Sequence, residues 1–128
     1  MSQAPPDAIE HLFVYGTLQP GDVRWPLLAP FAADDGVADA TNGRVFDTGE
    51  GYPAAVFDQA GTIVGRTYRL RADRLDAALA ALDEEEFSVP GGYRRVVVTT
   101  VAGTTAWAYE YGSGLELTPI DSGSWLTR

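Results

Sequence analysis

Three consecutive glutamates, Glu84, Glu85 and Glu86, end a predicted helix over residues 71–87 and are the residues best suited to proton transfer. On a helical wheel at about 100° per residue, Glu86 continues the leucine stripe of this helix, Glu84 faces the opposite side and Glu85 lies to one side. A carboxylate turned toward a core must be paired, hydrogen-bonded or protonated, and desolvation raises its pKa toward that of a general base. The pattern predicts Glu86 as a candidate acid–base residue. The alternative is a solvated helix end, which charge runs usually form.

A glycine and a hydroxyl follow the first predicted strand, residues 11–15, in the order Gly16-Thr17-Leu18. Glycine lets the main chain approach a ligand, and successive free N–H groups can form an anion-binding nest. The alternative is an ordinary strand-to-turn transition with Thr17 as a helix N-cap, and these residues alone favour it.

Two tyrosines could line a pocket. Tyr52 precedes Pro53, which biases its backbone to an extended conformation, and it either walls a pocket or belongs to a rigid loop over the core. Tyr93 opens a predicted strand on which Arg95 returns to the same face. An arginine near Glu86 would keep that acid ionised, whereas the alternative is a surface arginine pair.

The elements that must position these residues are short strands and one main helix. Thr, Val and Tyr dominate the strand patterns, and Ala102-Gly103 has the character of a hairpin turn. The predicted strands cover residues 11–15, 43–47, 54–58, 62–70, 93–103 and 104–112. The main helix, with Asp73 as its cap, covers residues 71–87, and a shorter one lies within residues 25–31. About six strands joined mostly by short loops predict an α+β fold, a small mixed sheet or barrel with a helix against it.

Composition restricts the chemistry further. The chain has 128 residues, no cysteine and one histidine, and all its basic residues are arginine, so thiol and Schiff-base catalysis are excluded. A net charge of −9 disfavours nucleic-acid binding. We expect a loose tail over residues 1–10, which has no signal-peptide pattern, and a single domain over residues 11–128. Because there is neither a cysteine nor a membrane-spanning apolar run, we expect a cytoplasmic protein that is not bound to a membrane.

Several stretches, taken in order, resemble the γ-glutamylcyclotransferase-like family, also called AIG2-like. Any one of these motifs is weak, but their order and spacing make the combination specific. The matching stretches are FVYGTL (13–18), GRVFDTGEGYPAAV (43–56), GRTYRL (65–70), LDEEE (82–86) followed by YRR (93–95), AWAYEY (106–111) and GSW (123–125).

The resemblance implies a small mixed barrel with short helices, and an enzyme that closes a γ-glutamyl group to 5-oxoproline and releases an amine or amino acid. The family's catalytic glutamate is the last residue of L-D-x-x-E, which is Glu86 here. The family's cavity includes the loop after the first strand, so the resemblance assigns substrate binding to Tyr15, Gly16, Thr17 and Leu18, with Tyr52 and Tyr93 as walls. It implies no metal and no cofactor.

Two features leave the substrate open. Many relatives have Gly where Phe87 stands, and residues 88–92 separate Phe87 from Tyr93, which puts the shape of the entrance in question. γ-Glutamyl amino acids, γ-glutamyl-amine adducts of lysine and γ-glutamyl biosynthetic intermediates all present the same reacting end.

The alternative to an enzyme is a non-catalytic module that binds a γ-glutamyl or carboxylate ligand on the same fold. The sequence does not indicate an oligomeric state.

Overall fold

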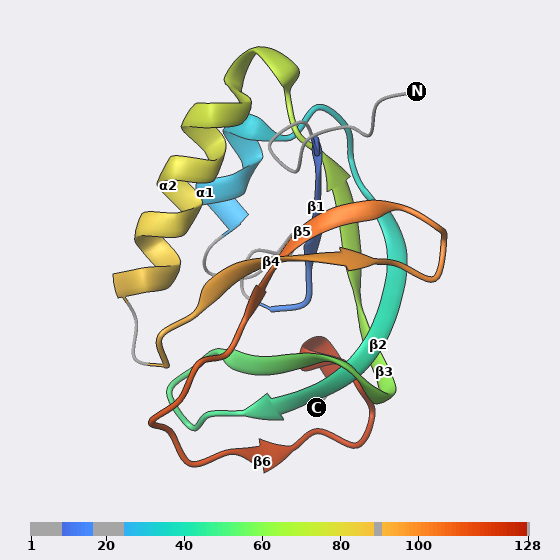
Figure 1. Cartoon of the computed structure of the whole chain (residues 1–128), viewed down its shortest axis with the longest axis vertical. Coiled ribbons are helices and arrows are strands. Elements are labelled where there is room, and N and C mark those ends of the chain that lie inside the picture. The colour runs from blue at the N-terminus through green and yellow to red at the C-terminus, as the bar shows by residue number, and fades with distance from the viewer. Residues whose placement is uncertain (1–8, 17–24, 89–90, 128) are drawn as a thin grey trace.

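Six strands form one curled, mixed sheet with helices against one side of it (Figure 1). The computed structural model describes residues 9–16, 25–88 and 91–127. The strands are β1 (His11–Val14), β2 (Val37–Asp47), β3 (Pro53–Arg69), β4 (Arg94–Thr99), β5 (Thr105–Glu110) and β6 (Thr118–Pro119). The helices are α1 (Trp25–Leu28), α2 (Leu75–Ser88) and the 3₁₀ turns η2 (Ala29–Phe31), η3 (Ala72–Arg74) and η4 (Trp125–Thr127).

The sheet has the strand order β4-β5-β1-β3-β2-β6, so the first strand lies near its centre. β1 runs parallel to β5, and every other neighbouring pair is antiparallel. The sheet curls until the turn after β4 meets β2, where the Val101 amide donates to the Ala40 carbonyl at 2.7 Å. The fold is therefore a half-barrel, and the predicted α+β architecture of a small mixed sheet with one main helix is confirmed.

β3 differs from the two strands predicted over residues 54–58 and 62–70, because it is one continuous strand of 17 residues. Its pairing with the 11-residue β2 shifts register between Asn42 and Gly43. Gly43 has φ +151°, and a Cβ there would lie 2.5 Å from the Val56 carbonyl oxygen, so glycine permits this close crossing. A bulge of this kind absorbs extra residues and bends the pair, so the turn-forming residues 58–61 do not end the strand.

The β4–β5 hairpin turns at the predicted Ala102-Gly103, where the Thr100 amide donates to the Thr104 carbonyl at 2.9 Å. β6 was not predicted, because a pairing of two residues leaves no periodic pattern in the sequence. The predicted short helix within residues 25–31 is present as α1 and η2.

The main helix begins later than predicted. Residues 72–74 form the turn η3, in which the Arg74 amide donates to the Arg71 carbonyl at 3.0 Å, and α2 starts at Leu75. The prediction that Asp73 caps this helix is therefore wrong, since Asp73 lies inside η3 and forms an ion pair with Arg71 at 3.8 Å. α2 packs on the sheet through Ala78, Leu79 and Leu82, all buried.

The start of the described chain is held against the sheet. The Trp107 indole donates to the Ile9 carbonyl at 3.2 Å, and Glu10 lies 3.7 Å from Arg69 as an ion pair. Most of the predicted tail over residues 1–10 lies outside the described residues. Within the described part of the chain, no helix is long and apolar enough to cross a membrane.

Candidate active site

Tyr15 follows the central strand β1 and is almost fully buried. Its hydroxyl donates to the main-chain carbonyl of Tyr109 on the parallel neighbour β5, at 2.5 Å. Burial raises the pKa of Tyr15 well above its ordinary value, and the charges of Glu86 and Glu110 raise it further. Tyr15 is therefore a protonated hydrogen-bond donor at neutral pH, and Glu86 lies near enough for its charge to act on this hydroxyl.

Gly16 lies against the start of β3 in a contact that only glycine permits. A Cβ on Gly16 would lie 2.6 Å from Cγ and 2.8 Å from Cδ of Pro53, well inside van der Waals distance. The Pro53 carbonyl in turn accepts a hydrogen bond from the Tyr93 hydroxyl at 2.6 Å. The structure thus brings together Tyr15, Gly16 and Tyr93, whereas Thr17 and Leu18 lie outside the described residues.

Tyr52 and Tyr93 form an aromatic wall beside this contact. Their ring centroids lie 6.1 Å apart with the planes at 71°, an edge-to-face arrangement. Tyr93 is buried and Tyr52 is half-buried, and the Tyr52 carbonyl accepts the Thr48 hydroxyl at 2.7 Å. The two predicted wall residues are therefore neighbours, and their contact with a substrate stays a prediction.

Glu86 stands near the end of α2, on the side that the wheel predicts. Glu84 is exposed, whereas Glu85 and Glu86 are both half-buried and Leu82, four residues before Glu86, is buried. The charge of Glu86 adds to burial in raising the pKa of Tyr15, which follows β1, and adds to burial and Asp83 in raising the pKa of Tyr109 on β5. Glu86 therefore lies within electrostatic reach of the hydroxyls of Tyr15 and Tyr109.

A second cluster, absent from the sequence predictions, links α2 to β4 and β5. Asp83 Oδ1 accepts the Tyr109 hydroxyl at 2.6 Å and lies 3.1 Å from Arg95 Nε. The Arg95 guanidinium lies 4.3 Å from the centroid of the Trp107 ring, in cation–π range. The arginine considered as a partner of Glu86 thus pairs with Asp83. Trp107 and Tyr109, two residues apart, share one face of β5, and that alternation was the available signal.

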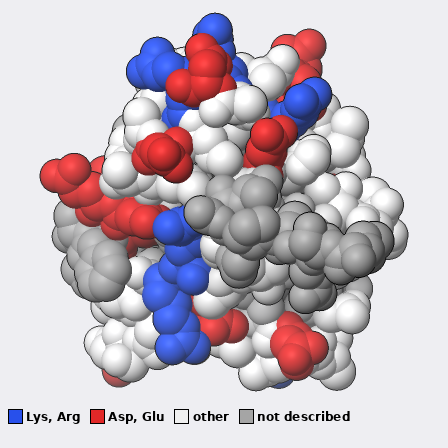
Figure 2. All heavy atoms as spheres, turned by 45° about the horizontal axis from the view of Figure 1, so that its top comes forward, with Lys and Arg blue, Asp and Glu red and all other residues white. Residues whose placement is uncertain are grey.

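These residues line a hollow between α2 and the β4–β5 hairpin. Its volume is about 310 Å³, and aromatic rings and charged groups share its walls. Lining residues are Asp83, Tyr93, Arg94, Arg95, Trp107 and Tyr109. On the face in Figure 2, carboxylates lie directly beside the arginines, including those that form a continuous strip near the middle of the view.

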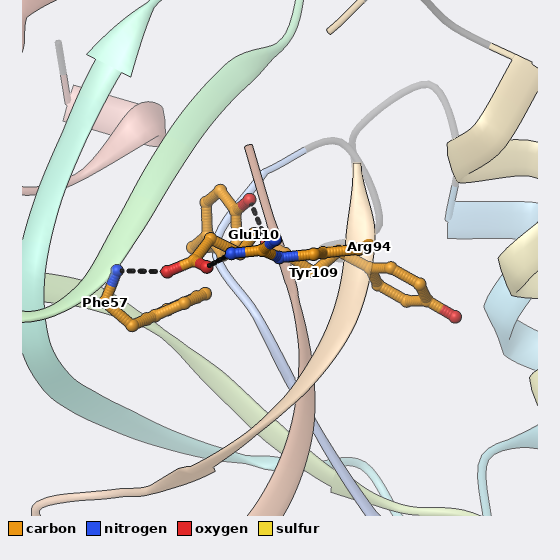
Figure 3. Close-up of polar contacts among 5 residues, drawn as sticks. Phe57, Arg94, Tyr109 and Glu110 are labelled. Carbon is orange, nitrogen blue, oxygen red and sulfur yellow. Dashed lines mark hydrogen bonds and ion pairs between the residues drawn. The ribbon is translucent and has the colours of Figure 1, made fainter. Parts of the chain in front are cut away.

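Glu110 is the other carboxylate whose charge raises the pKa of Tyr15, and it has a structural role. Its Oε2 accepts the Phe57 amide at 3.0 Å and its Oε1 accepts Arg94 Nη2 at 2.9 Å. Figure 3 shows this carboxylate between β3 and β4, with the Tyr109 ring pointing away from it. Because both oxygens hold partners, we interpret Glu110 as a cross-link at the bulge and not as a proton carrier.

The comparisons with known proteins agree with one another. A family model described as gamma-glutamyl cyclotransferase, AIG2-like, matches residues 12–127. A γ-glutamylcyclotransferase family protein of Citrobacter rodentium is 36% identical over 124 residues, which cover 91% of this chain and 96% of that protein.

Solved structures share the fold. An uncharacterized protein from Pyrococcus horikoshii superposes with a TM-score of 0.69 at 25% identity, covering 90% of this chain and 88% of the other. An AIG2-like protein from Mus musculus superposes with a TM-score of 0.60 at 19% identity, covering 93% of this chain and 92% of the other.

Proposed function

Because the chain belongs to the AIG2-like γ-glutamyl cyclotransferase family, we propose that it is an enzyme that cyclises a γ-glutamyl group to 5-oxoproline, with Glu86 as its acid–base residue. The observation that carries this proposal is the position of Glu86, which is half-buried near the end of α2. Its charge contributes to the raised pKa of the Tyr15 and Tyr109 hydroxyls. A carboxylate in partly desolvated surroundings is suited to accept and return a proton near neutral pH.

The reaction needs no nucleophile from the protein. The substrate's α-amine attacks its own γ-carbonyl carbon, a C–N bond forms within the new ring, and the original amide C–N bond breaks. The attacking nitrogen loses one proton and the leaving nitrogen gains one. One carboxylate can therefore accept the first proton and donate it to the leaving nitrogen. The protein's main task is to hold the γ-glutamyl chain folded back on itself, which converts ring closure into a well-oriented intramolecular step.

We assign substrate binding to the loop after β1, residues Tyr15 to Leu18, with Tyr52 and Tyr93 as the wall. The close contact of Gly16 with Pro53 supports this, because it packs the start of the loop against the residue whose carbonyl accepts the hydroxyl of the wall residue Tyr93. Main-chain N–H groups in such a loop suit a substrate carboxylate or the oxyanion that develops on the γ-carbonyl.

A cytoplasmic location also stays a prediction, based on the absence of cysteine.

The test is an assay of 5-oxoproline release from three kinds of compound: γ-glutamyl amino acids, γ-glutamyl-ε-lysine and γ-glutamyl amines. We expect release from at least one class, with the amine appearing in equal amount. Binding of the same compounds without any release, measured by calorimetry, would instead indicate the non-catalytic module.

A further inference from the structure

We propose that Asp83 is a positioning residue for Glu86, acting through the hydroxyl of Tyr109; this inference rests on the proposed function of Glu86. Asp83 precedes Glu86 by three residues, so the two side chains lie about one helical turn apart on neighbouring parts of the same surface of α2. A contact that fixes Asp83 against the sheet therefore also fixes the turn that carries Glu86.

The hydrogen bond from Tyr109 is the directional part of this contact. The Tyr109 hydroxyl lies 2.6 Å from Asp83 Oδ1, and Tyr109 is buried in the sheet. A short hydrogen bond between a phenol and a carboxylate is charge-assisted and stronger than a neutral one. Arg95 Nε lies 3.1 Å from the same oxygen but lacks hydrogen-bond alignment, so this arginine contributes charge and packing.

Tyr109 also holds the other side of the candidate site. Its main-chain carbonyl accepts the Tyr15 hydroxyl, at the point where the chain leaves β1 for the loop at Gly16. One residue of β5 therefore contacts α2 through its side chain and the residue before the β1 loop through its backbone. This connection, together with the packing of Ala78, Leu79 and Leu82 on the sheet, fixes the separation between the proposed acid–base residue and the proposed binding loop.

A purely structural contact would lower stability and leave the turnover of the folded protein unchanged. A positioning contact lowers kcat at a nearly constant KM, because a carboxylate displaced by about 1 Å still leaves the binding loop in place. The two roles are therefore separable in folded protein, at a temperature well below every melting midpoint.

The experiment compares Tyr109→Phe and Asp83→Ala with two controls. Tyr109→Phe removes one hydroxyl and keeps the ring and the net charge. Tyr111→Phe is the matched control, because that hydroxyl contacts the Leu115 backbone and not α2. Asp83→Asn is the conservative variant, because its amide oxygen can still accept from Tyr109.

With the best γ-glutamyl substrate, we expect Tyr109→Phe and Asp83→Ala each to lower kcat about tenfold with KM changed less than about twofold. The double variant should lose no more than the worse single variant, and Asp83→Asn should keep most of the turnover. Unchanged kcat in Tyr109→Phe and Asp83→Ala, or fully additive losses, would overturn the positioning role while leaving the proposed function intact.

Amide hydrogen exchange tests the same connection without any activity. Exchange at residues 84–86 should be about tenfold faster in Tyr109→Phe than in the wild type or in Tyr111→Phe. If no γ-glutamyl compound is cyclised, the proposed function fails, and equal exchange in all three proteins would overturn this inference independently.

Discussion

The Tyr15 hydroxyl donates to the Tyr109 carbonyl at 2.5 Å, and this bond joins residues 94 positions apart in the chain. It connects the end of β1 to β5, while the Tyr109 side chain reaches Asp83 on α2. The loop proposed to bind substrate and the helix proposed to carry the acid–base residue thus meet at one strand.

The contact between Gly16 and Pro53 predicts that Gly16→Ala is costly. A Cβ placed 2.6 Å from Pro53 Cγ forces the loop or the proline to move. We expect a loss of about 1–3 kcal/mol in the free energy of unfolding, measured in urea, together with weaker substrate binding.

Pro53→Ala is the matched background, since it removes Cγ and Cδ but keeps the carbonyl that accepts from Tyr93. In that background Gly16→Ala should cost less than about 1 kcal/mol. Equal costs in both backgrounds would show that the contact does not require the glycine.

We expect removal of the Tyr93 hydroxyl to lower the stability of the folded protein. In Tyr93→Phe the buried Pro53 carbonyl loses its donor, so we expect the free energy of unfolding to fall by about 1–2 kcal/mol. Urea denaturation measures this, and a change below about 0.3 kcal/mol would mean that water replaces the hydroxyl. KM should rise as well, because Tyr93 supports both the proposed wall and Pro53.

Asp39 predicts a pH-dependent stability far from the candidate site. Desolvation raises the pKa of this carboxyl, but hydrogen bonds from Thr100, the Ala40 amide, Thr67 and the Ala102 amide outweigh it, and the net pKa is lowered. A lowered pKa in the folded state stabilises the protein at neutral pH, and this contribution disappears as the pH falls through that value.

We therefore expect Asp39→Asn to lower the free energy of unfolding by about 1 kcal/mol at pH 7, and the gap to the wild type to close in acid. Glu116→Gln, an exposed acid in a loop, serves as the control for removing one charge. A gap for Asp39→Asn that stays constant between pH 7 and about pH 2 would contradict the shift.

We expect Tyr15 and Tyr109 to make the folded protein less stable at high pH. Burial raises the pKa of both hydroxyls in the folded protein, with nearby carboxylates adding to it. Stability from such groups is complete below the unfolded pKa of about 10 and is lost as the pH rises above it. We expect the absorbance of these tyrosinates to appear only together with unfolding, and Tyr15→Phe to weaken the fall in stability above that pH.

Local patterns were sufficient for much of the fold. The leucine spacing predicted the buried face of α2, where Leu79 and Leu82 are buried, and the runs of Thr, Val and Tyr located β4 and β5. They did not predict β3 as one strand. Its pairing with β2 shifts register at Gly43, so the strand continues through the turn-forming residues 58–61. Asp83, Arg95 and Tyr109 were missed as a cluster because their contact depends on how α2 docks on the β4–β5 register, which no single segment encodes.

The central claim is that Glu86 carries the proton in ring closure, and a matched pair of substitutions tests it most directly. Glu86→Gln and Glu84→Gln remove the same charge from neighbouring positions, one half-buried and one exposed. For 5-oxoproline release from the best substrate, we expect kcat/KM to fall about 10²–10⁴-fold in Glu86→Gln and less than about twofold in Glu84→Gln. A folded Glu86→Gln protein that keeps wild-type kcat/KM would contradict the assignment.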